Sequence, residues 1–209
     1  MTNAVTLRPA GPHDADSVAW LHADSWRRHY RGAYSDEFLD GDVEADRRTV
    51  WAGRLQQQAG LSATILAEDG GGIAGFVHVV FDVDERWGSL LDNLHVRDDR
   101  QRGGIGRALM AAAADAVASG AQRPAMFLWV LQQNTRAQAF YAAVGGRCVE
   151  EKPVPPPGGV PGRLAGAPRC YRFVWSDLDT VRRVRASATS PAPACSIASA
   201  SSSRTTPRT

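Results

Sequence analysis

Short runs of hydrophobic residues alternate with polar turns along the chain, and this pattern predicts a β-sheet. Apolar residues dominate 63–68 and 73–81, and Asp69-Gly70-Gly71-Gly72 between them is typical of a hairpin turn. We expect the remaining strands at the other short apolar or alternating runs, which are 5–9, 89–96, 126–131, 147–150 and 170–175. The pattern therefore predicts a sheet of about seven strands.

Helical periodicity occupies the stretches between these strands. After Gly104, apolar residues recur every three or four positions, which places them on one face of a helix that ends at Gly120. Asn134 or Thr135 caps a second helix, which ends at Gly145. Further helices are expected after 13–17 and, with an interruption near residue 41, between 36 and 58. We therefore predict an α/β (α+β type) fold, in which about four helices flank a mixed, strongly twisted sheet.

Two segments depart from this pattern. Residues 153–168 contain three consecutive prolines and several glycines, so we expect a long surface loop, which is either a substrate lid or a tolerated insertion. The C-terminal residues are almost entirely Ser, Ala, Thr, Pro and Arg, and they cannot bury enough apolar area to offset chain entropy. We therefore expect one folded domain, 1–180, and a disordered tail, 181–209.

Composition and charge exclude several classes of partner. The 24 basic and 22 acidic residues give a formal net charge of +2, which is too balanced to indicate nucleic-acid binding. No apolar stretch approaches the roughly 20 residues that span a bilayer, and the N-terminus lacks the features of a secretion signal. We therefore expect a cytoplasmic protein with no nucleic-acid or membrane partner.

The cysteines and histidines do not indicate a metal centre or a nucleophile. The five histidines do not cluster at the spacing of metal ligands, and the three cysteines form no Cys-x-x-Cys pair. No cysteine stands beside a histidine or at a helix start, where its pKa would be lowered. We expect no metal and no covalent intermediate on the enzyme.

The strongest candidate ligand site is the turn before the helix that starts near Gly104. It follows the predicted strand 89–96 and reads Gln101-Arg102-Gly103-Gly104-Ile105-Gly106. The first amides of a helix lack internal partners, and the helix dipole places partial positive charge there. Glycines allow the backbone to approach a ligand closely. The turn therefore predicts a cradle for a diphosphate, to which Arg102 and Arg107 add positive charge.

Other phosphate-binding motifs fit this turn less well. A dinucleotide fingerprint that starts at Gly104 requires a glycine where Leu109 stands, and a P-loop requires a Gly-Lys-Ser or Gly-Lys-Thr sequence that is absent. Taken alone, the six residues are also compatible with a glycine turn that is purely structural.

Two blocks of sequence together resemble the signature of the GNAT superfamily of acetyl-CoA-dependent N-acetyltransferases. The first block is Leu94-His95-Val96, a polar loop and the Gln-x-x-Gly-x-Gly turn; the second is Leu128-Trp129-Val130, Asn134, Phe140-Tyr141 and Gly145-Gly146. The resemblance implies that acetyl-CoA, as co-substrate, binds between two splayed central strands and that a primary amine attacks its thioester directly. The alternatives are a non-catalytic acyl-CoA-binding or regulatory module and a nucleotide-dependent enzyme.

The resemblance also implies roles for individual residues. Leu94, His95 and Val96 would contact the pantetheine arm, and the backbone amide of Leu94 would stabilise the oxyanion. Tyr141 would contact the cofactor and protonate the departing thiolate, although an amphipathic tyrosine packed at a helix edge is the structural alternative. Asn134, a helix cap in its own right, would also contact the arm. The diphosphate would lie on Gln101, Arg102, Gly103, Gly104, Ile105, Gly106 and Arg107.

The general base is not given directly by the resemblance. An alkyl amine with a pKa near 10.4 is almost fully protonated at pH 7 and must lose a proton before it attacks. Family members often carry a glutamate for this step at the position where this chain has Leu90. Asp92, two residues on and hence on the same strand face, is our first substitute. His95 and Glu37 follow, with a structural role or a water relay as the alternative. The sequence leaves open a possible homodimer and the acceptor, which is a small-molecule amine, a polyamine-like amine or a protein N-terminus.

Overall fold

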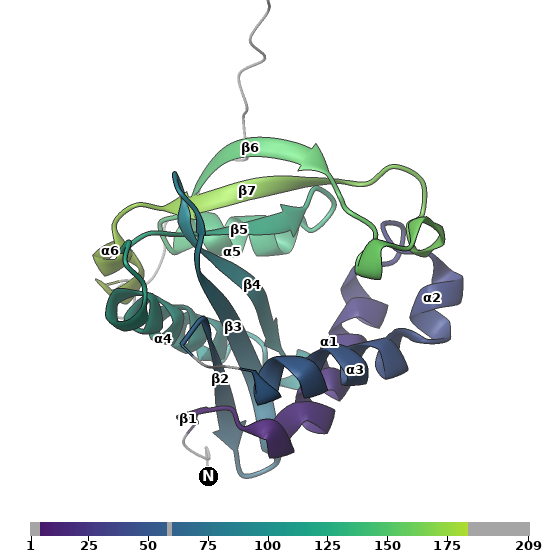
Figure 1. Ribbon diagram of the computed structural model, residues 1–209, viewed down its shortest axis with the longest axis horizontal. Helices are drawn as coiled ribbons and strands as arrows, with labels where there is room; N and C mark the ends of the chain where they lie inside the picture. Colours follow the sequence, from purple (N-terminus) through teal and green to yellow (C-terminus); the bar gives the residue numbers. More distant parts are fainter. Residues whose placement is uncertain (1–4, 58–59, 184–209) are drawn as a thin grey trace, which may run out of the picture.

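One twisted sheet of seven strands runs through the molecule (Figure 1). The computed structural model describes residues 5–57 and 60–183. In their order across the sheet, the strands are β1 (Thr6–Pro9), β2 (Ser62–Asp69), β3 (Gly72–Asp84), β4 (Gly88–Val96), β5 (Met126–Leu131), β7 (Arg169–Trp175) and β6 (Arg147–Pro153). Neighbouring strands are antiparallel, except that β4 and β5 run parallel. The predicted mixed sheet is therefore confirmed.

Six α-helices within the described residues surround this sheet. They are α1 (Ala15–His29), α2 (Asp36–Asp40), α3 (Val43–Gln56), α4 (Ile105–Gly120), α5 (Thr135–Ala143) and α6 (Leu178–Arg183). Along β3, Phe76 packs with α1 and α3, whereas Val77 and Val79 pack with α4. This is the two-residue period of a strand, and burial of both faces explains why β3 is almost continuously apolar. No helix in the described part of the chain has the length and apolar character needed to cross a membrane.

Close packing at Gly75 fixes the start of α4 against the end of β4. A Cβ at Gly75 would lie 2.8 Å from the His95 carbonyl oxygen, 3.1 Å from Leu109 and 3.3 Å from Ile105. Any larger residue would push α4 away from the sheet. The glycine on β3 therefore positions the turn that precedes α4.

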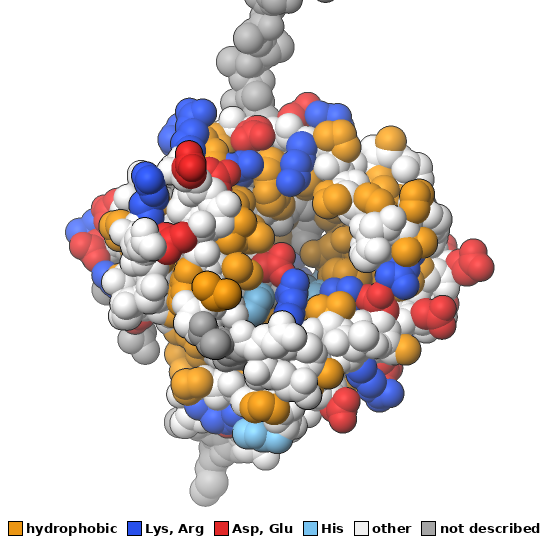
Figure 2. Space-filling model, viewed as in Figure 1, with side chains coloured by type: hydrophobic (Ala, Val, Ile, Leu, Met, Phe, Trp, Pro, Cys, Tyr) orange, Lys and Arg blue, Asp and Glu red, His pale blue; other side chains and the backbone are white. Residues whose placement is uncertain are grey.

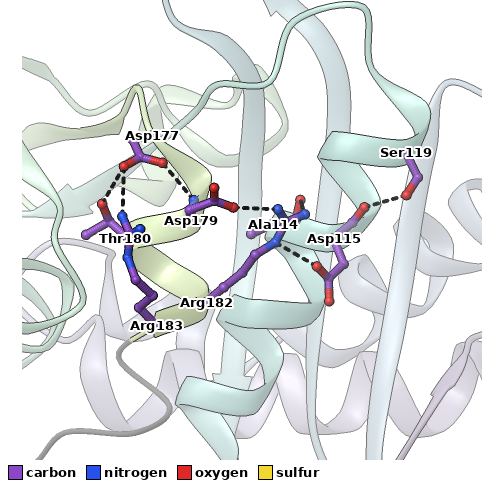
Figure 3. A network of polar contacts seen from close by, with 8 residues as sticks. All are labelled: Ala114, Asp115, Ser119, Asp177, Asp179, Thr180, Arg182 and Arg183. Carbon is purple, nitrogen blue, oxygen red and sulfur yellow. Dashed lines mark hydrogen bonds and ion pairs between the residues drawn. The ribbon is translucent and has the colours of Figure 1, made fainter.

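The last described element, α6, packs against α4 (Figure 3). Leu178 and Val181 are buried, and Arg182 forms an ion pair with Asp115 of α4 at 2.8 Å. Because α6 extends to Arg183, it crosses the predicted boundary between residues 180 and 181. The rest of the predicted tail lies outside the described residues.

Replacing Leu178 with alanine is expected to lower the free energy of unfolding by about 2–4 kcal/mol, the range typical of a buried leucine that leaves a cavity. Asp179→Ala on the exposed side of the same helix is the matched control and should change stability little. Urea unfolding measures both. Equal, small effects would mean that α6 is not part of the folded domain.

Candidate active site

The parallel strands β4 and β5 separate after a short stretch of pairing, which opens the sheet at its centre. Ser89 pairs with Met126 and Leu90 with Phe127, and the ladder between the two strands ends there. Beyond Leu90, the residues of β4 have no partner on β5. The splayed pair expected from the resemblance is therefore present.

A β-bulge at Asp92 decides which amides of β4 face this gap. The Ser89 amide donates to Ala125 on the β5 side, whereas the Arg97 amide donates to Ala74 at the end of β3 nearest the β2–β3 turn. In a regular strand, residues an even number apart would point their amides the same way. The register against β3 steps from Leu91 to Asn93, so Asp92 is the extra residue that reverses the alternation.

After the bulge, alternation assigns a direction to each remaining amide of β4. Those of Asn93 and His95 face β3, as the Arg97 amide does, and those of Leu94 and Val96 face the gap. The side chains of Leu94 and Val96 are partly buried and pack on the α4 side of the core. The two residues expected to contact the pantetheine arm through their backbones thus have the required orientation.

The turn before α4 has the conformation that its glycines indicated. Gly104 is in the left-handed region with φ 85°, and a Cβ there would meet nothing within 4 Å. Arg102 also has a positive φ, 65°, which is uncommon for a residue other than glycine and typical of functional turns. The first amide of α4 that donates backwards is that of Ala108, to Gly104 at 3.0 Å. The amides that precede it at the start of α4 have no carbonyl one turn earlier to which they could donate a hydrogen bond.

The helix α5 begins after its cap Asn134 and carries Tyr141, which belongs to the same hydrophobic cluster as Leu94 and Val96. The Asn134 Oδ1 accepts from the Ala137 amide at 3.0 Å, so its role as helix cap is realised. Tyr141 is buried, with its ring close to those of Phe173 and Trp175. Burial raises the pKa of Tyr141 above its usual value near 10, so the hydroxyl stays protonated at neutral pH.

A cavity of about 640 Å³ lies on the other side of the gap, between α1, α3, β4, β5, β7 and the proline-rich loop. Figure 2 shows it as a hollow in this face, with acidic, basic and histidine side chains around it. Its aromatic walls and volume are typical of a small-molecule site. A second depression, of about 800 Å³, lies between the start of α1 and the β2–β3 turn and contains none of the predicted catalytic residues.

Of the candidate bases, Asp92 has the most suitable position. Its carboxylate lines the cavity and forms an ion pair with Arg54 of α3, with 2.7 Å between Nη1 and Oδ2. Leu90 lines the same cavity, which agrees with the expectation that the two residues share a side of β4. Tyr30, at the end of α1, is close enough for Asp92 to contribute to raising its pKa to about 12, after burial. Glu37 is exposed on α2 and does not line the cavity.

His95 also lines the cavity, but its surroundings keep it neutral. Its Nδ1 lies 2.8 Å from the Ser25 Oγ, and its ring lies 4.6 Å from that of His22 between centroids. Burial lowers the pKa of His95 to about 3 and that of His22 well below the usual value. The His95 side chain thus lies between the cavity and α1. Its backbone amide faces β3 and not the gap.

Several residues of the cavity were not predicted from the sequence. Asn93 is buried, and its Oδ1 has no hydrogen-bond partner within the described residues. The Arg172 guanidinium lies 4.5 Å from the centroid of Trp129. Their sequence neighbourhoods read as ordinary strands, and no local signal marks them. Lys152, in contrast, is the single lysine of the chain, and that composition could have drawn attention to it.

Comparison with known proteins agrees with this geometry. Residues 22–145 match the model of the acetyltransferase (GNAT) family. The chain is 29% identical to an uncharacterised N-acetyltransferase, YuaI, from Bacillus subtilis, over 70% of this chain and 83% of the relative. It is 27% identical to a probable N-acetyltransferase, Rv2775, from Mycobacterium tuberculosis, over 72% of this chain and 86% of that protein.

The fold is also similar to a solved structure, the PaiA N-acetyltransferase from Thermoplasma acidophilum in complex with coenzyme A. The TM-score is 0.60 at 15% identity, and the match covers 81% of this chain and 98% of the other. The family model spans more than half of the chain, and it confirms the predicted enzyme class, an acetyl-CoA-dependent N-acetyltransferase. The chain belongs to the acetyltransferase (GNAT) family.

Proposed function

We propose that this enzyme transfers the acetyl group of acetyl-CoA to a primary amine held in the cavity beside Asp92. The observation that carries the proposal is the gap between β4 and β5. It borders the α4 turn on one side and the cavity on the other, and the Leu94 and Val96 amides face into it. A thioester in the gap would thus meet an amine from the cavity.

The residues at the start of α4 fit the diphosphate of acetyl-CoA. The amides of Ile105, Gly106 and Arg107 begin the helix, and the open backbone at Gly104 leaves room for phosphate oxygens. The Gln101 Nε2 lies 3.5 Å from the Val96 carbonyl oxygen, which ties the turn to the end of β4. The PaiA structure of similar fold holds coenzyme A, which supports this assignment.

In the proposed reaction, the amine nitrogen attacks the thioester carbon and the carbon–sulfur bond then breaks. The Leu94 amide stabilises the oxyanion, a contribution typically worth about 3–4 kcal/mol. Tyr141 gives its proton to the departing thiolate, and Asp92, directly or through water, removes a proton from the amine. The unpartnered Asn93 Oδ1 is available to accept a hydrogen bond from the same amine.

The test is thiol release from acetyl-CoA over a panel of amines, which includes amino acids, polyamines and peptides with free N-termini. Turnover with at least one class is expected. Binding of coenzyme A with no turnover across the whole panel would favour a non-catalytic acyl-CoA-binding module. The same protein preparation also serves to measure whether the homodimer that the sequence left open forms.

Replacing Asp92 with asparagine is expected to lower kcat roughly 10- to 30-fold, with the KM for acetyl-CoA unchanged. The loss should stay below the 10²–10⁴ typical of general bases, because Asp92 also pairs with Arg54 and water can share the proton transfer. Steady-state kinetics with the best acceptor measure the effect.

Asp84→Asn is the matched control for this variant. Asp84 lines the same cavity, is similarly exposed and forms an ion pair with Arg172 at 2.9 Å. Its Oδ1 also accepts from the Arg86 and Trp87 amides, an acceptor that asparagine keeps. It lies on β3, away from the bulge, and should leave kcat nearly unchanged. If the two variants lose kcat equally, Asp92 acts only through the charge of the cavity and is not the base.

A further inference from the structure

The cavity contains more positive than negative side chains, and all but one of the cations have a carboxylate partner. Arg54 pairs with Asp92 at 2.7 Å and Arg172 with Asp84 at 2.9 Å. Arg47 pairs with its neighbour Asp46. Each guanidinium thus has a carboxylate within ion-pair distance, although Asp46 also pairs with Arg163 at 2.6 Å and Arg172 also pairs with Glu150 at 3.2 Å. The remaining cation is Lys152.

Lys152 lies on β6 and reaches back over β5. Its Nζ lies 4.0 Å from the centroid of the Trp129 ring, and the residue is half-buried. No carboxylate lies within 4 Å of Nζ among the residues that the structure describes. The two neighbouring acids are engaged elsewhere, Glu150 with Arg172 and Glu151 with Arg169. The ammonium group therefore faces the cavity with hydrogen-bond donors to spare.

An aromatic ring stabilises such an ammonium group only in part. A cation–π contact orients the group but accepts none of its three N–H donors as a carboxylate would. Neighbouring strands lie about 4.8 Å apart, so Lys152 over Trp129 of β5 and Asp92 of β4 line the same cavity from positions at least about one strand spacing apart. A small molecule with an amine at one end and an anionic group at the other fits between them.

We infer that the acceptor is a small amine that also carries a carboxylate, and that Lys152 binds this carboxylate while the amine lies beside Asp92. The inference rests on the proposed function, because it names the acceptor of the same site. It also disfavours the polyamine-like acceptor that the sequence left open, since a second cation would face Lys152, the cation of the cavity lining that has no carboxylate partner among the described residues.

Matched acceptors test the carboxylate directly. L-amino acids, their carboxamides and the corresponding decarboxylated amines share the amine and the side chain but differ in charge. We expect kcat/KM to be highest for the amino acids. Similar or higher values for the carboxamides or decarboxylated amines would overturn the inference and leave the proposed function intact. No thiol release with any amine would instead contradict the proposed function.

The variant Lys152→Met tests the residue. The KM for the carboxylated acceptor should rise roughly 10- to 100-fold, the range expected for losing a charged hydrogen bond, with the KM for acetyl-CoA and the activity on carboxamides unchanged. Lys152→Arg should restore most of the preference. Arg169→Met removes a neighbouring cation outside the cavity and should have no effect. An equal loss on charged and neutral acceptors, or none with Lys152→Met, would refute the role of Lys152.

Discussion

Replacing Tyr141 with phenylalanine is expected to lower kcat at least 100-fold while leaving the dissociation constant of coenzyme A nearly unchanged. The ring packs against Phe173 and Trp175, and phenylalanine preserves these contacts. What is lost is the hydroxyl proposed to protonate the thiolate, and proton transfer by a positioned side chain is typically worth 10²–10⁴ in rate. Pre-steady-state and steady-state turnover, with calorimetric titration of coenzyme A, separate the two quantities.

The pH profile adds a second measurement for Tyr141. Because burial raises the pKa of Tyr141, the protonated form is favoured, and the proton remains available at pH values up to and beyond the usual value near 10. The wild-type enzyme should therefore show no loss of kcat from this group between pH 7 and 10. Tyr171→Phe removes a hydroxyl that bonds to Gln132 away from the cavity and should behave as wild type. If Tyr141→Phe has an unchanged kcat across the pH range, Tyr141 is not the acid.

The local pattern of hydrophobic and polar residues predicted most of the fold because it reflects which face of each helix or strand is buried. The two-residue period of β3 and the three- to four-residue period of α4 correspond to faces that the structure buries. The short helix α6 was not predicted, since its six residues offer only Leu178 and Val181 as apolar positions. That is too short a run to show a helical period.

The sequence predicted only those parts of the candidate site that depend on the local conformation of the backbone. Glycines report on the turn before α4, and its left-handed Gly104 agrees with them. The bulge at Asp92 has no signature in the sequence, yet it decides which amides of β4 face the gap. The cavity is built by residues far apart in the chain, such as Arg54 with Asp92 and Lys152 with Trp129. Such pairs depend on how helices and strands pack, which local pattern does not encode.

The second large effect is expected at the turn before α4, where Gly104→Asp should weaken coenzyme A binding more than 100-fold. The substitution places a carboxylate among the amides proposed to hold the diphosphate. Like charges about 4 Å apart at a protein surface repel by about 4 kcal/mol before screening, and 1.4 kcal/mol is a tenfold change in affinity. Isothermal titration with coenzyme A measures the dissociation constant, and the effect should shrink as salt is added.

Strain alone could also weaken binding, and Gly60→Asp separates strain from charge. Gly60 has φ 77° against 85° at Gly104, and a Cβ at either position meets nothing within 4 Å, so the backbone cost of aspartate is similar. Gly60→Asp should therefore lower the melting temperature as much as Gly104→Asp but leave coenzyme A binding intact. Gly104→Asn, which tolerates the left-handed region without a charge, should lose far less affinity than Gly104→Asp. Equal affinities for coenzyme A in all three variants would place the diphosphate away from the α4 amides, and the proposed orientation of the thioester in the gap would then be wrong.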